Sequence, residues 1–91
     1  MLTIYSKNNC PFCVMAKNYL DSKGIAFREI NIEQDTEARE FIQQQGLRTV
    51  PQIFMDGKIF VVGGWSGLSK MTAEDILSEI DLRNSLADQT L

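Results

Sequence analysis

The stretch LTIYSKNNCPFCV, residues 2–14, places both cysteines of the chain between a predicted strand and a predicted helix. Its first part, LTIY, is apolar and β-prone, which is typical of a short strand, and SKNN is a polar loop. Pro11 suits the first position of a helix, because its missing N–H has no helical partner there. We therefore expect Cys10 at the carboxyl end of a strand, where open α/β sheets tend to bind ligands.

Alternating strand and helix patterns continue beyond this stretch. Apolar periodicity and end signals predict strands at 2–5, 26–32, 51–55 and 58–62 and helices at 11–23, 35–46 and 72–86. Asp56-Gly57 is a strong signal for a two-residue hairpin turn between the last two strands. The pair Gly63-Gly64 interrupts the pattern after them, and we expect no further element before residue 72.

Three local signals define the two later helices. Asp35 or Thr36 is expected to cap the middle helix, and Thr72 with Asp75 has the spacing of a capping box at the last one. The expected inner stripe of the last helix consists of Ile76, Leu77, Ile80 and Leu86. From residue 87 onward we expect a frayed tail.

The predicted order β-α-β-α-β-β-α indicates an α/β fold. Its first half implies a parallel crossover unit and its second half an antiparallel hairpin, which together make a four-stranded mixed sheet flanked by helices. The 91 residues correspond to a single domain, 1–91, without repeats or linkers.

Charge and composition exclude several functional classes. Residues 1–68 hold equal numbers of acidic and basic side chains, so residues 69–91 supply the whole net charge of −3. No basic stripe is present, so we expect no nucleic-acid partner. A membrane partner is not expected either, because the sequence lacks a long apolar run. No secretory signal is visible, and we expect a cytoplasmic protein.

Two cysteines three residues apart are compatible with a metal site, a structural staple, a redox pair or coincidence. A structural zinc site needs four ligands, and the chain has two cysteines and no histidine, so carboxylates or a second chain would have to complete it. A reducing cytosol disfavours a purely structural disulfide. These arguments favour a redox pair and predict no metal.

The predicted helix gives the two cysteines unequal roles. Cys10 precedes the helix, where unpaired N–H groups and the helix dipole stabilise an anion, so the pKa of its thiol should lie below the usual value. Cys13 lies one turn further in and is more shielded, which suits a resolving thiol. Pro11 offers no N–H and stiffens the turn. Lys7 adds a nearby positive charge, unless it is simply a solvated lysine.

Two further motifs each allow two interpretations. In RTVPQIF, residues 48–54, Pro51 can begin a strand in trans, or a cis Val50–Pro51 bond can present the Val50 backbone to an extended peptide. In GGWS, residues 63–66, the glycines can form a simple loop or a backbone platform for an anionic group.

Together, YSKNNCPFC, TVPQIF and GGWS make residues 1–68 resemble a dithiol glutaredoxin of the CPFC type. The resemblance implies a thioredoxin-like fold, a cis Pro51, and a glutathione-dependent oxidoreductase that reduces protein disulfides and glutathione mixed disulfides. It implies catalytic Cys10 and Cys13, activated by Lys7, Pro11 and Phe12. The implied glutathione-binding residues are Lys7, Phe12, Thr49, Val50, Pro51, Gly64 and Ser66.

The sequence departs from the glutaredoxin pattern at two places. Trp65-Ser66-Gly67 lacks the acidic residue that usually follows the glycine pair. The helical position that usually carries a side chain for the glycine carboxylate falls on Ala38, and Arg39, Gln43 or Arg48 is expected to substitute for it.

These departures leave alternatives open. WSG resembles NrdH-type redoxins, which take electrons from thioredoxin reductase and supply ribonucleotide reductase, but which lack the glycine pair. A glutathione-assisted iron–sulfur carrier is a further alternative, disfavoured by Pro11. The resemblance implies glutathione and disulfide-containing or glutathionylated proteins as partners, ribonucleotide reductase among the candidates, and a monomer.

Overall fold

The computed structural model of the protein describes residues 1–89. The strands are β1 (Leu2–Ser6), β2 (Phe27–Asn31), β3 (Gln52–Met55) and β4 (Lys58–Val61). The helices are α1 (Pro11–Ser22), α2 (Thr36–Gln44), α3 (Gly64–Leu68) and α4 (Ala73–Gln89). All seven predicted elements are present, and their boundaries lie within three residues of the expected ones.

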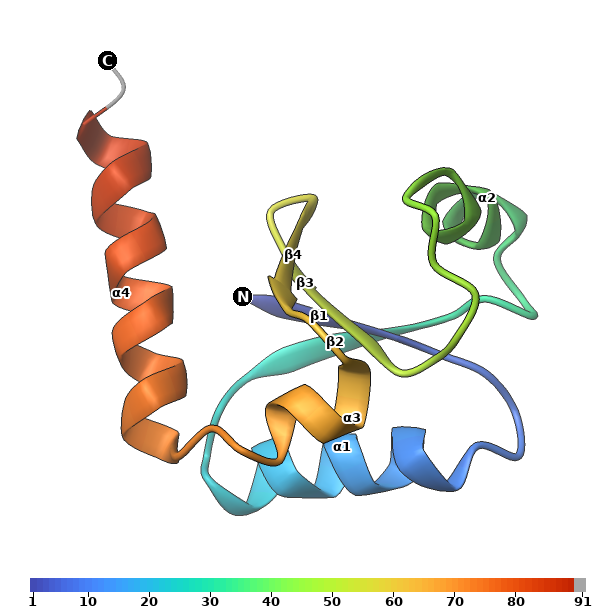
Figure 1. Ribbon diagram of the computed structural model, residues 1–91, viewed down its shortest axis with the longest axis horizontal. Helices are drawn as coiled ribbons and strands as arrows, with labels where there is room; N and C mark the ends of the chain where they lie inside the picture. Colours follow the sequence, from blue (N-terminus) through green and yellow to red (C-terminus); the bar gives the residue numbers. More distant parts are fainter. Residues whose placement is uncertain (90–91) are drawn as a thin grey trace.

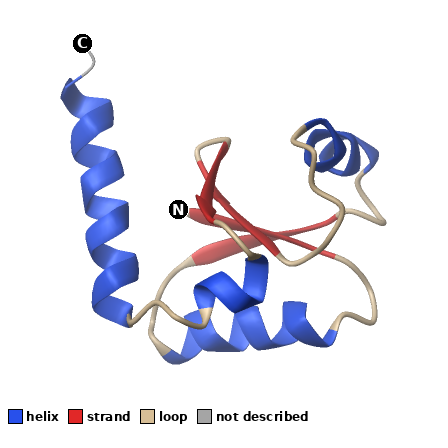
Figure 2. Ribbon diagram, viewed as in Figure 1, coloured by secondary structure: helices blue, strands red, loops and turns tan. Residues whose placement is uncertain are grey.

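The four strands form the expected mixed sheet in the order β2-β1-β3-β4. Strand β1 pairs in parallel with β2 and antiparallel with β3, which pairs antiparallel with β4. Asp56 and Gly57 join β3 to β4 with φ of 52° and 77°, the left-handed conformation that a two-residue hairpin turn requires. Helices α1 and α3 cover one face of the sheet and α2 covers the other (Figures 1 and 2).

The alternation of side chains along β1 supplies both faces of the sheet. Leu2 and Ile4 are fully buried in the main core with α1, whereas Tyr5 packs with Phe41 of α2 and Phe54 of β3 on the other face. Burying an apolar side chain of this size contributes about 1.5–3 kcal/mol, so the two clusters hold the helices on opposite faces. No helix within residues 1–89 is long and apolar enough to cross a membrane.

Side-chain caps fix the starts of α2 and α4, as predicted. The Asp35 carboxylate accepts a hydrogen bond from the N–H of Ala38 at 3.0 Å. Thr72 and Asp75 form the reciprocal capping box, with hydrogen bonds of 2.9 Å and 3.1 Å between each side chain and the other's N–H. These bonds satisfy donors that the first helical turn leaves without partners.

The expectation that Gly63-Gly64 leads into irregular chain was wrong. Gly63 caps a short additional helix, α3, with a φ of 96°. Helix α3 packs on the same side of the sheet as α1 (Figure 2). A five-residue helix that contains two glycines has little propensity of its own, so tertiary packing forms it.

The expected inner stripe of α4 was only half right. Ile76 is fully buried and Ile80 packs against the core, but Leu77 and Leu86 are 50% and 53% exposed. Arg83 anchors the helix instead, because its guanidinium lies 4.9 Å from the Phe60 ring centroid and donates to the Phe60 carbonyl. The helix continues through residues 87–89, where fraying was expected; residues 90–91 lie outside the described part of the chain.

Candidate active site

The two cysteines lie at the start of α1 and are joined by a disulfide, with 5.2 Å between their Cα atoms. Cys10 is the N-cap residue, and its Sγ accepts a hydrogen bond from the Cys13 N–H at 3.2 Å. Cys10 is 8% exposed and Cys13 is 1% exposed. Cys13 is therefore the more shielded residue of the pair, as predicted.

The loop before β3 lies against Cys10. The Val50–Pro51 peptide bond is cis, as the resemblance implied, and the Val50 carbonyl oxygen lies 3.8 Å from Cys10 Sγ. Among the described residues, no backbone hydrogen bond in the turns and loops involves Val50. Its N–H is thus available to an extended ligand, and its carbonyl lies within hydrogen-bond distance of Cys10 Sγ.

Gln52 supports this loop, and sequence reasoning missed it. Its side chain is almost fully buried, and Nε2 donates to the Thr49 carbonyl at 3.0 Å and to Thr49 Oγ1 at 3.3 Å. A polar residue at the head of an apolar strand, directly after Pro51, was the signal that could have revealed it. Through these bonds, Gln52 fixes the backbone that precedes the cis bond.

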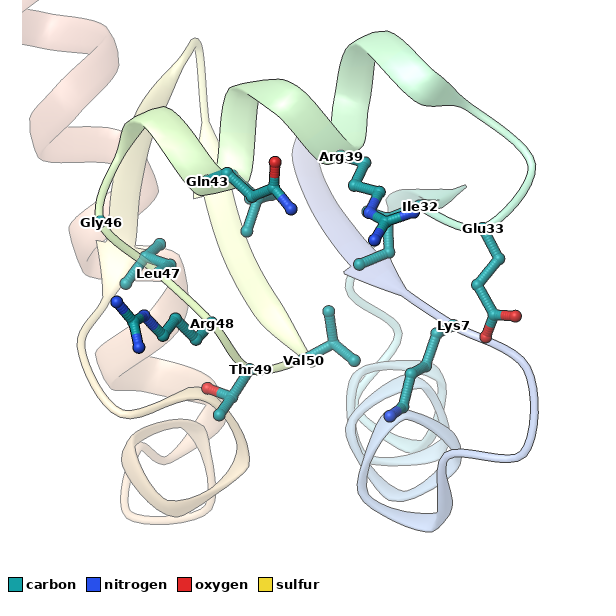
Figure 3. A pocket seen from close by; sticks show the side chains of 11 residues that line it. Lys7, Ile32, Glu33, Arg39, Gln43, Gly46, Leu47, Arg48, Thr49 and Val50 are labelled. Atoms are coloured by element: carbon teal, nitrogen blue, oxygen red, sulfur yellow. The ribbon is translucent and has the colours of Figure 1, made fainter.

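An open pocket of about 950 Å³ lies between α2, the loop before β3 and the loop after β1. Figure 3 shows Lys7, Arg39 and Glu33 on one side of it and Arg48 and Thr49 on the other. Three cationic side chains against one carboxylate make the pocket attractive to a small anion. The full lining is Lys7, Ile32, Glu33, Arg39, Ile42, Gln43, Gly46, Leu47, Arg48, Thr49 and Val50.

The structure divides the predicted binding residues into two groups. Lys7, Thr49 and Val50 line the pocket, together with all three candidate substitutes, Arg39, Gln43 and Arg48, whereas Ala38 is buried. The other predicted residues do not line it: Phe12, Pro51, Gly64 and Ser66.

These other residues lie on α1, on α3 and at the cis bond before β3. Phe12 is 57% exposed on α1, and Ser66 is exposed on α3. Pro51 is buried, and Gly64 packs directly against it, since a Cβ atom on Gly64 would lie 2.5 Å from the Pro51 carbonyl oxygen. Gly64 therefore allows α3 to approach the cis-proline loop.

A second hollow of about 610 Å³ opens on the other flank of the cysteines and includes Cys10, Cys13, Lys17 and Glu29 in its lining. Lys17 Nζ lies 2.8 Å from Glu29 Oε2, and the buried Ser6 hydroxyl donates to the same oxygen at 2.6 Å. The Lys17 and Ser6 hydrogen bonds lower the pKa of the Glu29 carboxyl, although partial burial opposes them. Sequence reasoning missed this cluster, because its members come from three separate elements.

The Glu29 carboxylate should make stability depend on pH. A carboxyl whose folded pKa is lowered stabilises the fold above its unfolded pKa and loses this contribution as the pH falls. For Glu29 the loss begins near its ordinary value of 4.5. The decrease in Tm between pH 7 and pH 3 should be smaller in Glu29→Gln than in the parent, by about 2–5 °C for a pair whose side chains are 29% and 37% exposed. Thermal melts measure it, with the exposed Glu40→Gln as control; parallel curves for Glu29→Gln and the parent would contradict the assignment.

Within residues 1–86, no three His, Cys, Asp or Glu side chains gather closely enough to hold a metal ion. The cysteine pair therefore has no protein ligands around it that would complete a site within this part of one chain. What the arrangement can do is exchange a thiol and a disulfide next to a cationic pocket.

Comparisons with known proteins agree with this site. The sequence model of the glutaredoxin family matches residues 2–61. Glutaredoxin 3 of Escherichia coli K12 is 42% identical over 71 residues, which cover 77% of this chain and 83% of that protein. The glutaredoxin-like protein NrdH of Lactococcus lactis subsp. cremoris is 45% identical over 60 residues, covering 66% of this chain and 83% of that protein.

Solved structures show the same architecture. A buckwheat glutaredoxin in complex with glutathione superposes with a TM-score of 0.69 at 26% identity, covering 88% of this chain and 76% of that one. Structures with a thioredoxin-like fold align over most of the chain, which confirms the predicted fold class.

Proposed function

Because the chain belongs to the glutaredoxin family, and is thus a thiol–disulfide oxidoreductase, we propose that it uses glutathione as its electron donor. It would reduce protein disulfides and glutathione mixed disulfides. The observation that carries the proposal is the cationic pocket lined by Lys7, Arg39 and Arg48, which also includes Val50, whose carbonyl lies beside Cys10 Sγ. Among the relatives named above, the buckwheat glutaredoxin was solved with glutathione.

Glutathione is a short extended peptide with a carboxylate at each end. Its binding site therefore needs backbone groups that pair with its central cysteinyl part and cationic side chains close to its carboxylates. The Val50 backbone would pair with the cysteinyl part and hold its sulfur near Cys10. Arg39, Gln43 and Arg48 would receive the glycine carboxylate, because guanidinium and amide groups bind carboxylates by charge-assisted or ordinary hydrogen bonds. The γ-glutamyl end would extend toward Gly64 and Ser66 on α3.

The reaction proceeds by thiolate exchange. The Cys10 thiolate attacks one sulfur of the substrate disulfide, forms a mixed disulfide and releases the other sulfur as a thiolate. Cys13, once deprotonated, attacks the Cys10 sulfur, which closes the internal disulfide and releases the reduced substrate. One glutathione thiolate then attacks Cys10, which forms a mixed disulfide with Cys10 and releases the Cys13 thiolate. A second glutathione thiolate attacks the glutathione sulfur of this mixed disulfide, which releases oxidised glutathione and the Cys10 thiolate.

A second candidate donor is thioredoxin reductase. Trp65-Ser66-Gly67 and the 45% identical NrdH protein favour it, and in that case ribonucleotide reductase is the candidate acceptor. The oxidised protein should be reduced efficiently by glutathione and only slowly by thioredoxin reductase with NADPH. Efficient reduction by the reductase alone would replace the first proposal with the second.

The pocket itself is tested by removing its cations. Arg39→Ala and Arg48→Ala should each raise the KM for glutathione, up to about tenfold for a lost charge-assisted hydrogen bond, with little change in kcat. Steady-state kinetics with a glutathionylated peptide measure both constants. Arg28→Ala, which removes an exposed arginine of β2 outside the pocket, is the matched control. An unchanged KM in both pocket variants would show that glutathione binds elsewhere.

The proposal extends to the state of the protein in the cell. We place it in the cytoplasm, as a monomer that carries no metal. An absorbance band in the visible range after anaerobic reconstitution with iron and sulfide would instead support the iron–sulfur carrier.

A further inference from the structure

The loop that carries Cys10 is held by residues at the end of β2 and just beyond it. Residues 7–10 connect β1 to α1, and Asn9 within them has a φ of 55°, a left-handed conformation that asparagine adopts more readily than most residues. The loop belongs to no helix or strand, so partners outside it help to fix its shape.

Three hydrogen bonds supply those partners. The Asn8 N–H donates to Glu33 Oε1 at 3.0 Å, and Asn31 Nδ2 donates to Asn8 Oδ1 at 2.9 Å. The Glu33 N–H donates to Asn31 Oδ1 at 2.9 Å, which closes the network. The backbone of Asn8 is thus held by Glu33, just after β2, and its side chain by Asn31, the last residue of β2.

The network reaches both hollows, which share Lys7 in their linings. Lys7, the residue before Asn8, lines both hollows, whereas Asn31 lines one and Glu33 the other. Figure 3 shows Lys7 and Glu33 next to each other at the edge of the cationic pocket. A shift of Asn8 would therefore move the Lys7 ammonium and the Cys10 thiol together.

We propose that Asn31 and Glu33 are positioning residues that hold Asn8 and thereby set the placement of Lys7 and Cys10 for thiolate attack. The inference rests on the thiol–disulfide activity of the family and not on glutathione as the donor. Neither residue needs to touch a substrate. Their contribution comes from hydrogen-bond geometry, and in Glu33 the acceptor oxygen matters rather than the charge.

The test measures the reactivity of Cys10 directly. In a Cys13→Ser background, Cys10 is the only thiol, and the pH dependence of its alkylation by iodoacetamide reports the pKa of its thiol. Asn31→Ala should move this profile upward by about half to one pH unit, the equivalent of roughly one hydrogen bond. In the full dithiol protein, reduction of a small aromatic disulfide should slow by about fivefold.

Glutamine and alanine at residue 33 separate geometry from charge. Glu33→Gln keeps the acceptor oxygen and should leave the alkylation profile within about 0.2 unit of the parent, whereas Glu33→Ala should behave like Asn31→Ala. Equal shifts in the two Glu33 variants, or a downward shift in Glu33→Gln, would show that the charge acts, and would overturn the proposal.

Further variants exclude a merely structural effect. Asn18→Ala removes an exposed asparagine of α1 with no side-chain hydrogen bond among the described residues, and should leave both readouts unchanged. Asn8→Ala removes the same bond from the loop side, so its effect should not add to that of Asn31→Ala. Additive effects of Asn8→Ala and Asn31→Ala would overturn the proposal, and so would an alkylation profile of Asn31→Ala identical to that of Asn18→Ala. If Asn31→Ala does not fold, Asn8→Ala alone provides the same test.

Discussion

Cys10→Ser should abolish all thiol-transfer activity, whereas Cys13→Ser should lose only the reduction of protein disulfides. Cys10 is the more exposed residue of the pair and caps α1, so we expect it to make the first attack on every substrate. Cys13 is needed only when the mixed disulfide must be resolved within the protein. Cys13→Ser should therefore retain a substantial fraction of the turnover of a glutathionylated peptide, while its rate with insulin disulfides falls below detection.

Parallel assays with the two substrates check both parts of this expectation. Ser22→Ala at the end of α1 is a suitable control, because it changes one hydroxyl on the same helix far from the cysteines. An active Cys10→Ser with an inactive Cys13→Ser would reverse the assigned roles.

Gly64→Ala should destabilise the fold and disturb the active site at the same time. A Cβ atom there would meet the Pro51 carbonyl oxygen at 2.5 Å, and the φ of 56° disfavours alanine. The left-handed conformation costs about 1–2 kcal/mol and forced overpacking about 1–3 kcal/mol more. The free energy of unfolding should fall by about 2–5 kcal/mol, and activity should fall in the molecules that remain folded, because Pro51 lies in the loop beside Cys10.

Gly24→Ala separates these two costs. Gly24 has a φ of 68°, but a Cβ atom at this residue would have no neighbouring atom within 4 Å, so only the conformational cost applies. Denaturant titrations of both variants measure the difference. Equal losses of stability would mean that the close approach of Gly64 to Pro51 contributes nothing.

Local signals in the sequence predicted most of the fold. The Asp56-Gly57 turn, the Asp35 cap and the Thr72–Asp75 box depend on residues within a few positions of one another, and each was confirmed. Helix α3 and the outer surface of α4 could not be predicted in this way. Helix α3 forms because a glycine-rich segment packs against the rest of the fold. The exposure of Leu77 and Leu86 on α4 depends on how far this helix extends beyond the sheet, and the periodicity of apolar residues does not reveal that extent.

In the candidate site, too, the residues that are close in the sequence could be predicted, and those brought together by folding could not. Cys10 and Cys13 are close in the sequence, and the positions of both could be predicted from one turn of helix. Arg39 and Arg48 enter the pocket from a helix and from a loop, and only the folded chain shows that both line it. Gln52 was missed because its role depends on contact with Thr49 across the turn at Pro51.

The central position of β1 has a consequence for the order in which the molecule opens. This strand is hydrogen-bonded along both of its edges, to β2 and to β3, and the cysteine loop begins where it ends. Local unfolding generally begins in elements with few buried side chains, such as the part of α4 that exposes Leu82 and Leu86, and reaches doubly paired strands late. The reactive thiols are therefore attached to a part of the chain that opens late, and transient fraying at the periphery leaves the catalytic loop anchored at its β1 end.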